Sequence, residues 1–363
     1  MQTNERYIRQ MILPGFGIAA QQKLCEAKVL IIGVGGLGCP ALQYLVGAGV
    51  GCIGIVDADN VSMSNLHRQL LFTEKEIGQK KVTAAEAKMN LLNPETKINT
   101  YPFAITNQNA LAIITEYDLV IDGTDNFSTK YLINDACVIL GKPFVYGAVS
   151  RYEGQVSVFN LPDASGRSLN YRDLFPVSPT AGEIQSCEEA GVLGVLPGII
   201  GVMQAAEAIK LITGIGESLY GRLYNYDLLR ANSYEIRLAQ HPANILIDRD
   251  SFEGMNYGML CGDDDDITEI NIAEFKHMVK QPNVFVLDVR EFHEYPKIDF
   301  SDAQIPMSEL KTSMSAIPEK EICIICHQGI RSVYAAQLIK AQRNLPVYSL
   351  KGGLTAYFNQ QES

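Results

Sequence analysis

The sequence has no block of lysine and arginine residues, although it is 363 residues long. Lysine and arginine together number 30, against 41 aspartate and glutamate residues, so the formal net charge is −11. Nucleic acids and anionic membranes bind basic surfaces, and neither is therefore expected as a main partner. The acidic balance instead suits solubility or a basic partner.

Long apolar runs are also missing. No stretch approaches the roughly 20 unbroken apolar residues of a membrane span, and the N-terminal MQTNERYIRQ has no apolar signal-peptide core. We therefore expect a cytoplasmic protein. The 8 cysteines are scattered, and four of them fall in apolar segments, so no disulfide framework is expected. These four are Cys25, Cys39, Cys52 and Cys137.

The sequence does contain an alternation of short β-rich runs with helical ones. Between Lys28 and Ile121, the runs KVLIIG, CIGIVDAD and DLVIDGTDN alternate with helical segments, as in the βαβ units of a parallel sheet. KPFVYGAVS and GQVSVFN predict an antiparallel extension. We expect an α/β protein with a Rossmann-like domain and mixed sheet at residues 1–242, an acidic linker at 243–268 and a smaller α/β domain at 269–363.

A glycine-rich turn, GVGGLG, follows the first of these strands. Gly33, Gly35 and Gly38 have the G-x-G-x-x-G spacing, which allows a tight turn, close approach of a phosphate and helix–strand packing. Amides at the start of the next helix favour an anion. Asp57, at the end of the next strand, is placed to bind ribose hydroxyls. The expected ligand is a nucleotide, and these features fit an NAD-dependent oxidoreductase as well as an ATP enzyme.

Residues at later strand ends favour ATP. SNLHRQ contains Asn65 and Arg68, GQKKV contains Lys81, and DGTDN contains Asp125 and Asn126. Cations and a carboxylate of this kind can hold a triphosphate with its Mg²⁺ and stabilise the charge that develops on the α-phosphate. Hydride transfer requires none of them.

From about residue 5 to 240 the sequence contains, in this order, the motifs RYIRQ, GxGGLG, DxDxVxxSNLxRQ, GxxKV, DxTDN and CxxAGV. Together they resemble the MoeB/ThiF family, relatives of ubiquitin-activating enzymes. The resemblance implies ATP-dependent adenylation of the C-terminal glycine of a ubiquitin-like sulfur carrier protein of the MoaD/ThiS type. It also implies a homodimer, because Arg9 corresponds to an arginine that reaches the phosphates of the neighbouring subunit. Which carrier, and whether it serves molybdopterin, thiamine or another pathway, stays open.

The same resemblance implies roles for individual pocket residues. Gly36, Asp57 and Asp59 would contact the nucleotide. Arg68 and Lys81 would contact its phosphates. Asp125 would bind Mg²⁺.

The resemblance further concerns a structural zinc ion and a loop cysteine. Family members usually carry two C-x-x-C pairs that bind zinc, but Asn170, Asp173, Ala243 and Leu246 occupy the matching positions. No structural zinc is therefore expected, because a tetrahedral zinc site needs four good ligands. Cys187 corresponds to a cysteine that in some members forms a covalent link to the carrier, and an ordinary loop thiol is the alternative.

The C-terminal part resembles a rhodanese domain from about residue 269 to 360. CHQGIRS has the spacing Cys-x-x-x-x-Arg, with VLDVREFHEY before it and YSLKGGLTAY after it. By this resemblance Cys326 carries a persulfide, stabilised by loop amides and the following helix dipole, and Arg331 closes the loop. Cys323 completes a C-x-x-C pair, but it lies within a predicted strand and is expected to be inert core.

The two resemblances together predict a carrier-activating enzyme fused to a sulfurtransferase. A persulfide on Cys326, loaded by a donor such as a cysteine desulfurase, would supply sulfur directly or through Cys187 to give a thiocarboxylate. Two alternatives stay open. A non-catalytic scaffold would bind a carrier without catalysing pyrophosphate exchange, and an NAD-dependent oxidoreductase would bind nicotinamide.

Overall fold

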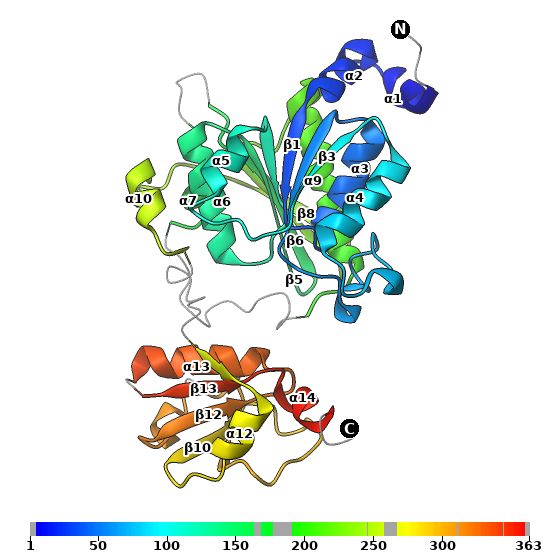
Figure 1. The fold of residues 1–363 in the computed structure, drawn as a ribbon. Coiled ribbons are helices and arrows are strands. Elements are labelled where there is room, and N and C mark those ends of the chain that lie inside the picture. The colour runs from blue at the N-terminus through cyan, green and yellow to red at the C-terminus, as the bar shows by residue number, and fades with distance from the viewer. Residues whose placement is uncertain are drawn as a thin grey trace. The chain divides into compact units, whose positions relative to one another are not determined.

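The computed structural model shows two compact units (Figure 1). Among the residues that the structure describes, those up to residue 257 form the first unit and those from residue 267 form the second. The described residues are 5–162, 168–176, 191–244, 246–257, 267–310, 312–343 and 345–359.

An eight-stranded mixed sheet forms the centre of the first unit, in the order β3-β2-β1-β4-β5-β6-β7-β8. The first five strands in the chain pair in parallel, and the last three continue the sheet antiparallel. This confirms the Rossmann-like mixed sheet predicted from the sequence. The strands are β1 (Lys28–Ile32), β2 (Cys52–Val56), β3 (Lys97–Tyr101), β4 (Leu119–Asp122), β5 (Phe144–Ser150), β6 (Glu153–Phe159), β7 (Arg222–Asp227) and β8 (Asn232–Arg237).

Helices cover both faces of this sheet, with α5, α6 and α7 on one side and α3, α4 and α9 on the other (Figure 1). The near-continuous burial of β1, β2 and β4 follows from this cover, because a parallel strand between two helical layers is apolar on both faces. The helices are η1 (Glu5–Tyr7), α1 (Ile8–Met11), α2 (Gly17–Glu26), α3 (Gly38–Ala48), η2 (Met63–Asn65), η3 (Glu74–Glu76), α4 (Lys81–Leu92), α5 (Ala110–Thr115), α6 (Phe127–Leu140), α7 (Tyr171–Leu174), α9 (Val195–Thr213) and α10 (Arg249–Gly254).

Helix α9 is the one described helix with the length and apolar composition of a membrane span. It contacts α3, β5 and β6, and its Leu196 and Ile200 are fully buried in the core of the first unit. These are the contacts of a core helix in a folded domain.

Residues 248–257 pack against the first unit, whereas the sequence analysis assigned 243–268 to a linker. Asn107 Nδ2 donates a hydrogen bond of 2.8 Å to the carbonyl oxygen of Glu253, and Phe252 is fully buried. This segment has the composition of a linker because only a few of its side chains pack against the rest of the first unit.

The second unit contains a five-stranded sheet in the order β11-β10-β12-β13-β9, in which all neighbouring strands are parallel. Cys323 lies within its central strand and is fully buried, and this burial raises the pKa of the thiol to about 12. Both facts agree with an inert core cysteine. The elements are β9 (Thr268–Ile270), α12 (Ile272–Met278), β10 (Val284–Asp288), β11 (Ala303–Gln304), η4 (Met314–Ala316), β12 (Glu321–Ile325), α13 (Ile330–Gln342), β13 (Val347–Leu350) and α14 (Gly353–Asn359).

Candidate active sites

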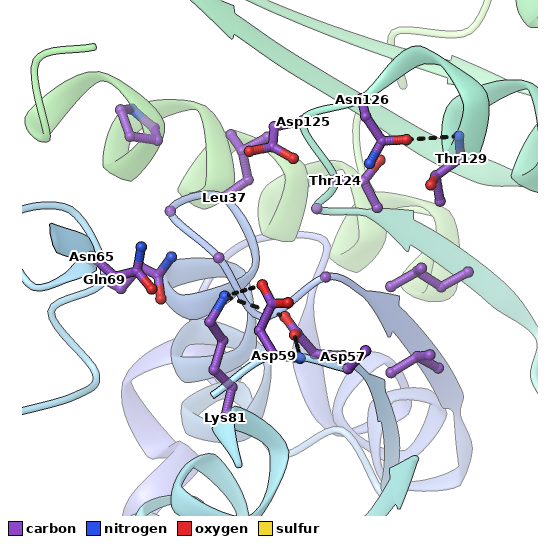
Figure 2. A pocket seen from close by; sticks show the side chains of 18 of the residues that line it. Leu37, Asp57, Asp59, Asn65, Gln69, Lys81, Thr124, Asp125, Asn126 and Thr129 are labelled. Atoms are coloured by element: carbon purple, nitrogen blue, oxygen red, sulfur yellow. Dashed lines mark hydrogen bonds and ion pairs between the residues drawn. The ribbon is translucent and has the colours of Figure 1, made fainter. Parts of the chain in front are cut away.

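A pocket opens in the first unit beside the ends of β1, β2 and β4 (Figure 2). Parallel strands end at the same edge of a sheet, so residues far apart in the sequence meet there. The lining includes all the predicted nucleotide-binding residues except Gly38. These are Gly33, Gly35, Gly36, Asp57, Asp59, Asn65, Arg68, Lys81, Asp125 and Asn126.

Gly38 has a packing role at the start of α3. A Cβ atom at this position would lie 1.9 Å from the carbonyl oxygen of Gly33, so a larger residue cannot fit there. Gly33 itself has a φ of +90°, which favours glycine, and a Cβ atom on it would lie 2.8 Å from the carbonyl oxygen of Gly123. The turn is therefore held close to the loop after β4.

Asp57 fixes the glycine-rich turn to the end of β2. Its Oδ2 accepts a hydrogen bond from Val34 N, and its Oδ1 accepts one from Asp59 N, both at 2.8 Å. Burial raises the pKa of Asp57, and the nearby ammonium group of Lys81 opposes this effect. The carboxylate therefore orders the turn in addition to lining the nucleotide pocket.

Lys81 is the buried cation of the pocket. It lies at the start of α4, is 5% exposed and points toward two carboxylates (Figure 2). Its Nζ is 2.8 Å from Asp59 Oδ2 and 3.9 Å from Asp57 Oδ2. The ammonium group is thus held where a phosphate could contact it, with its charge already balanced.

Gln69 is a pocket residue that the sequence analysis did not select. It is 3% exposed, and its Oε1 has no hydrogen-bond partner among the described residues. Its main-chain N donates a 2.9 Å hydrogen bond to Asn65 O, so the two residues are one helical turn apart. The spacing of one helical turn between Asn65 and Gln69 within SNLHRQ is the sequence signal that could have identified Gln69.

The loop after β4 presents Asp125 and Asn126 to the pocket. Asp125 is exposed, so its carboxylate is available to a ligand. Asn126 Oδ1 accepts a hydrogen bond of 2.9 Å from Thr129 N and so caps the start of α6 (Figure 2). Asn126 therefore has a structural function at this position, and contact with a nucleotide would be in addition to it.

A buried ion pair that the sequence analysis missed supports this loop. Lys130 Nζ lies 2.8 Å from Asp122 Oδ2 and donates to the carbonyl oxygens of Thr124 and Gly147 at 2.9 and 2.8 Å. Asp122 is fully buried and Lys130 is 4% exposed. The pair joins the end of β4, the pocket loop and β5.

We expect Lys130→Met to destabilise the first unit by about 3 to 5 kcal/mol, because it leaves the buried carboxylate of Asp122 without its partner. Urea unfolding followed by circular dichroism measures this change. Lys75→Met is the control, because Lys75 is exposed and its replacement should change stability by less than about 0.5 kcal/mol. Equal midpoints for Lys130→Met and the unmodified protein would contradict the expectation.

Arg9 lies away from the pocket of its own chain. Gln10 Nε2 donates a hydrogen bond to Ala48 O at the end of α3, and Arg6 Nη1 donates one to Leu92 O at the end of α4, both at 2.9 Å. The pocket lies at the opposite ends of these helices, and α3 alone is about 16 Å long at 1.5 Å per residue. A role for Arg9 at a nucleotide would therefore require a second copy of the chain.

In the second unit, Cys326 follows β12 directly and is 1% exposed. Its Sγ accepts hydrogen bonds from Gly329 N at 3.1 Å and from Ser332 N at 3.4 Å. Gly329 has a φ of +89°, which lets the loop turn into α13. Main-chain amides at a helix start stabilise an anionic sulfur, and this geometry therefore suits a reactive cysteine.

Arg331 forms a bidentate ion pair with Glu294, a residue that the sequence analysis did not select. The distances are 2.6 Å from Nη1 to Oε1 and 2.7 Å from Nη2 to Oε2. The hydrogen bonds from Arg331 hold the pKa of Glu294 down at about 2. Arg331 thus joins the Cys326 loop to the segment after β10, and Glu294 offsets much of its charge.

Cys187 lies outside the described residues, so its predicted link to a carrier stays a prediction. A family model described as the ThiF family matches residues 7–246. The chain belongs to the ThiF family. A second model, described as a rhodanese-like domain, matches residues 271–360 and confirms the predicted domain type of the second unit.

Some known relatives of this ThiF family member align with both units of the chain, and others align with about two thirds of it. The chain is 37% identical over 371 residues to "Probable adenylyltransferase/sulfurtransferase MoeZ" of Mycobacterium tuberculosis (strain ATCC 25618 / H37Rv), covering 98% of this chain and 93% of that protein. It is 48% identical over 239 residues to "Sulfur carrier protein adenylyltransferase" of Thermus thermophilus, covering 66% of this chain and 88% of that protein. Membership of this family favours adenylation over the NAD-dependent alternative.

A solved structure shares the fold of the first unit. MccB of E. coli has a TM-score of 0.59 at 20% identity, over 68% of this chain and 73% of that chain. At this identity the likeness supports the fold alone.

Proposed function

We propose that this protein uses ATP to adenylate the C-terminal carboxylate of a ubiquitin-like sulfur carrier and then converts it to a thiocarboxylate. The observation that carries the proposal is that one chain holds both a pocket suited to phosphates and a cysteine surrounded by main-chain amides. Relatives that combine the same two domains are named as adenylyltransferases and sulfurtransferases, which supports it. Each unit would supply one reactant of the sulfur-transfer step.

In the adenylation step, the carrier carboxylate attacks the α-phosphate of ATP and pyrophosphate leaves. Lys81, Arg68 and the amides of the glycine-rich turn would hold the phosphates in line for this attack. No general base is needed, because a carboxylate is ionised at neutral pH.

Asp125 is the residue that would hold Mg²⁺. An exposed carboxylate beside a triphosphate suits this ion, which is commonly bound by one or two carboxylates together with phosphates and water. When bound, Mg²⁺ would neutralise the charge that develops on the phosphates.

In the sulfur-transfer step, the terminal sulfur of a persulfide on Cys326 attacks the acyl carbon of the adenylated carrier. The bond between that carbon and the phosphate oxygen breaks, and AMP leaves. A thiol must then cleave the S–S bond to release the thiocarboxylate. Attack by the Cys187 thiol would release the thiocarboxylate and leave a disulfide between Cys187 and Cys326. An external thiol reductant must reduce that disulfide before a persulfide donor such as a cysteine desulfurase can reload Cys326.

The proposal includes a homodimer in the cytoplasm. The position of Arg9, at the far ends of α3 and α4 from the pocket of its own chain, supports a contribution of this arginine to the pocket of a second subunit. Neither nucleic acid nor membrane is proposed as a partner.

The test is to incubate the protein with ATP, Mg²⁺ and a persulfide source, together with a MoaD-type or a ThiS-type carrier, and to weigh the carrier by mass spectrometry. We expect one carrier to exchange an oxygen atom for a sulfur atom, and carrier-dependent exchange of pyrophosphate with ATP. Carrier binding without pyrophosphate exchange would instead support the non-catalytic scaffold.

A further inference from the structure

The residues at the family's zinc positions do not fit a zinc ion in this chain. Asn170 caps the start of α7, and Asp173 Oδ2 accepts a 2.9 Å hydrogen bond from its main-chain N. Asp173 Oδ1 accepts another, also of 2.9 Å, from His241 N. Ala243 and Leu246 have no ligating side-chain atom, and no group of three or more potential metal ligands gathers within the described ranges.

A buried polar cluster lies next to these positions. Asp135, on α6 and 2% exposed, accepts hydrogen bonds from the guanidinium group of Arg172 at 2.8 Å to Oδ1 and 2.7 Å to Oδ2. Tyr257 Oη donates to Oδ2 at 2.8 Å, and Asn134 Nδ2 donates to Oδ1 at 3.0 Å. We call these four residues the Asp135 cluster.

The Asp135 cluster joins three separate parts of the chain: α6, α7 and the end of the segment 248–257. The guanidinium group of Arg172 lies over the ring of Tyr131, 4.9 Å from its centroid, which adds a cation–π contact. Tyr131 Oη donates a 2.7 Å hydrogen bond to Phe175 O, just beyond α7. Burial, together with the charge of Asp135, raises the pKa of Tyr257 far above its ordinary value, so its hydroxyl stays a donor.

We infer that the Asp135 cluster fixes α7 and the segment after β8 to the body of the first unit, next to the positions where the resemblance implies a structural zinc ion in other family members. A buried ion pair whose partners are all hydrogen-bonded is costly to break, because removing one partner leaves an uncompensated charge. The Asp173 to His241 hydrogen bond acts in the same direction, since it links α7 to the chain after β8. The result is a clamp that does not depend on metal.

The test combines metal analysis with hydrogen exchange on the full-length protein. We expect only a small fraction of one zinc ion per chain, and no effect of EDTA on amide exchange. Tyr257→Phe keeps the ring but removes one hydrogen bond to a charged group, and it should speed exchange in peptides covering 168–176 and 246–257 about tenfold to a hundredfold. Exchange in α3 should not change.

Tyr234→Phe is the matched control, because Tyr234 is 54% exposed on β8, and it should leave exchange unchanged. Asp135→Asn should have a larger effect than Tyr257→Phe, and if it does not fold, Tyr257→Phe decides. One zinc ion per chain, with faster exchange in the same peptides after EDTA, would overturn the inference. Unchanged exchange in Tyr257→Phe would also overturn it.

Discussion

Asp125→Ala is expected to lower carrier adenylation about a thousandfold, which corresponds to the loss of several kcal/mol of stabilisation at the phosphates. The carboxylate of Asp125 is exposed in the pocket, and the helix cap beside it is provided by Asn126, so the fold should survive the change. Carrier-dependent exchange of labelled pyrophosphate with ATP measures the effect. Glu116→Ala, at an exposed residue that does not line the pocket, is the control and should leave exchange unchanged.

The same variant tests whether the two chemistries are separate. Asp125→Ala should load a persulfide on Cys326 as fast as the unmodified protein, because Cys326 obtains its amide donors from residues of the second unit. Mass spectrometry of the peptide that contains Cys326 reports the loading. A comparable loss of loading and of adenylation would show that the sites are not independent.

Cys326→Ser is expected to abolish thiocarboxylate formation and to leave pyrophosphate exchange at its normal rate. Serine fits the space left by the sulfur, but its oxygen cannot carry a persulfide. The mass of the carrier after incubation with ATP and a persulfide source measures the loss.

Cys25→Ser is the control for this experiment, because Cys25 is an exposed cysteine of the first unit. It should form thiocarboxylate as the unmodified protein does. Normal product formation by Cys326→Ser would mean that the rhodanese-like unit is not the source of the sulfur.

The sequence predicted which residues lie together at the pocket, because these residues follow strand ends and parallel strands end at one edge of a sheet. Asp57 and Asp125 could be placed together from the strand pattern alone. Lys130 and Glu294 could not, because each is defined by an ion-pair partner rather than by a motif. For Glu294 the partner lies 37 residues away.

The Asp135 cluster is a more extreme example of what a sequence pattern does not reveal. Tyr257 and Asp135 are 122 residues apart, and Tyr257 lies in a stretch with the composition of a linker. Pattern analysis detects periodic apolar faces, and this segment has none. Only the folded chain shows that the Tyr257 hydroxyl, the buried ring of Phe252 and the Asn107 side chain attach it to the domain.

The pairing of Lys81 with Asp59 and Asp57 affects which anions can occupy the pocket. The ammonium group already has counter-ions, so an entering polyphosphate exchanges one set of negative oxygens for another. Simple anions such as sulfate should gain little from that exchange, because they are too small to contact Lys81 and the rest of the pocket lining at once. We therefore expect the pocket to prefer a whole nucleotide to a small anion, because its buried cation is neutralised in advance.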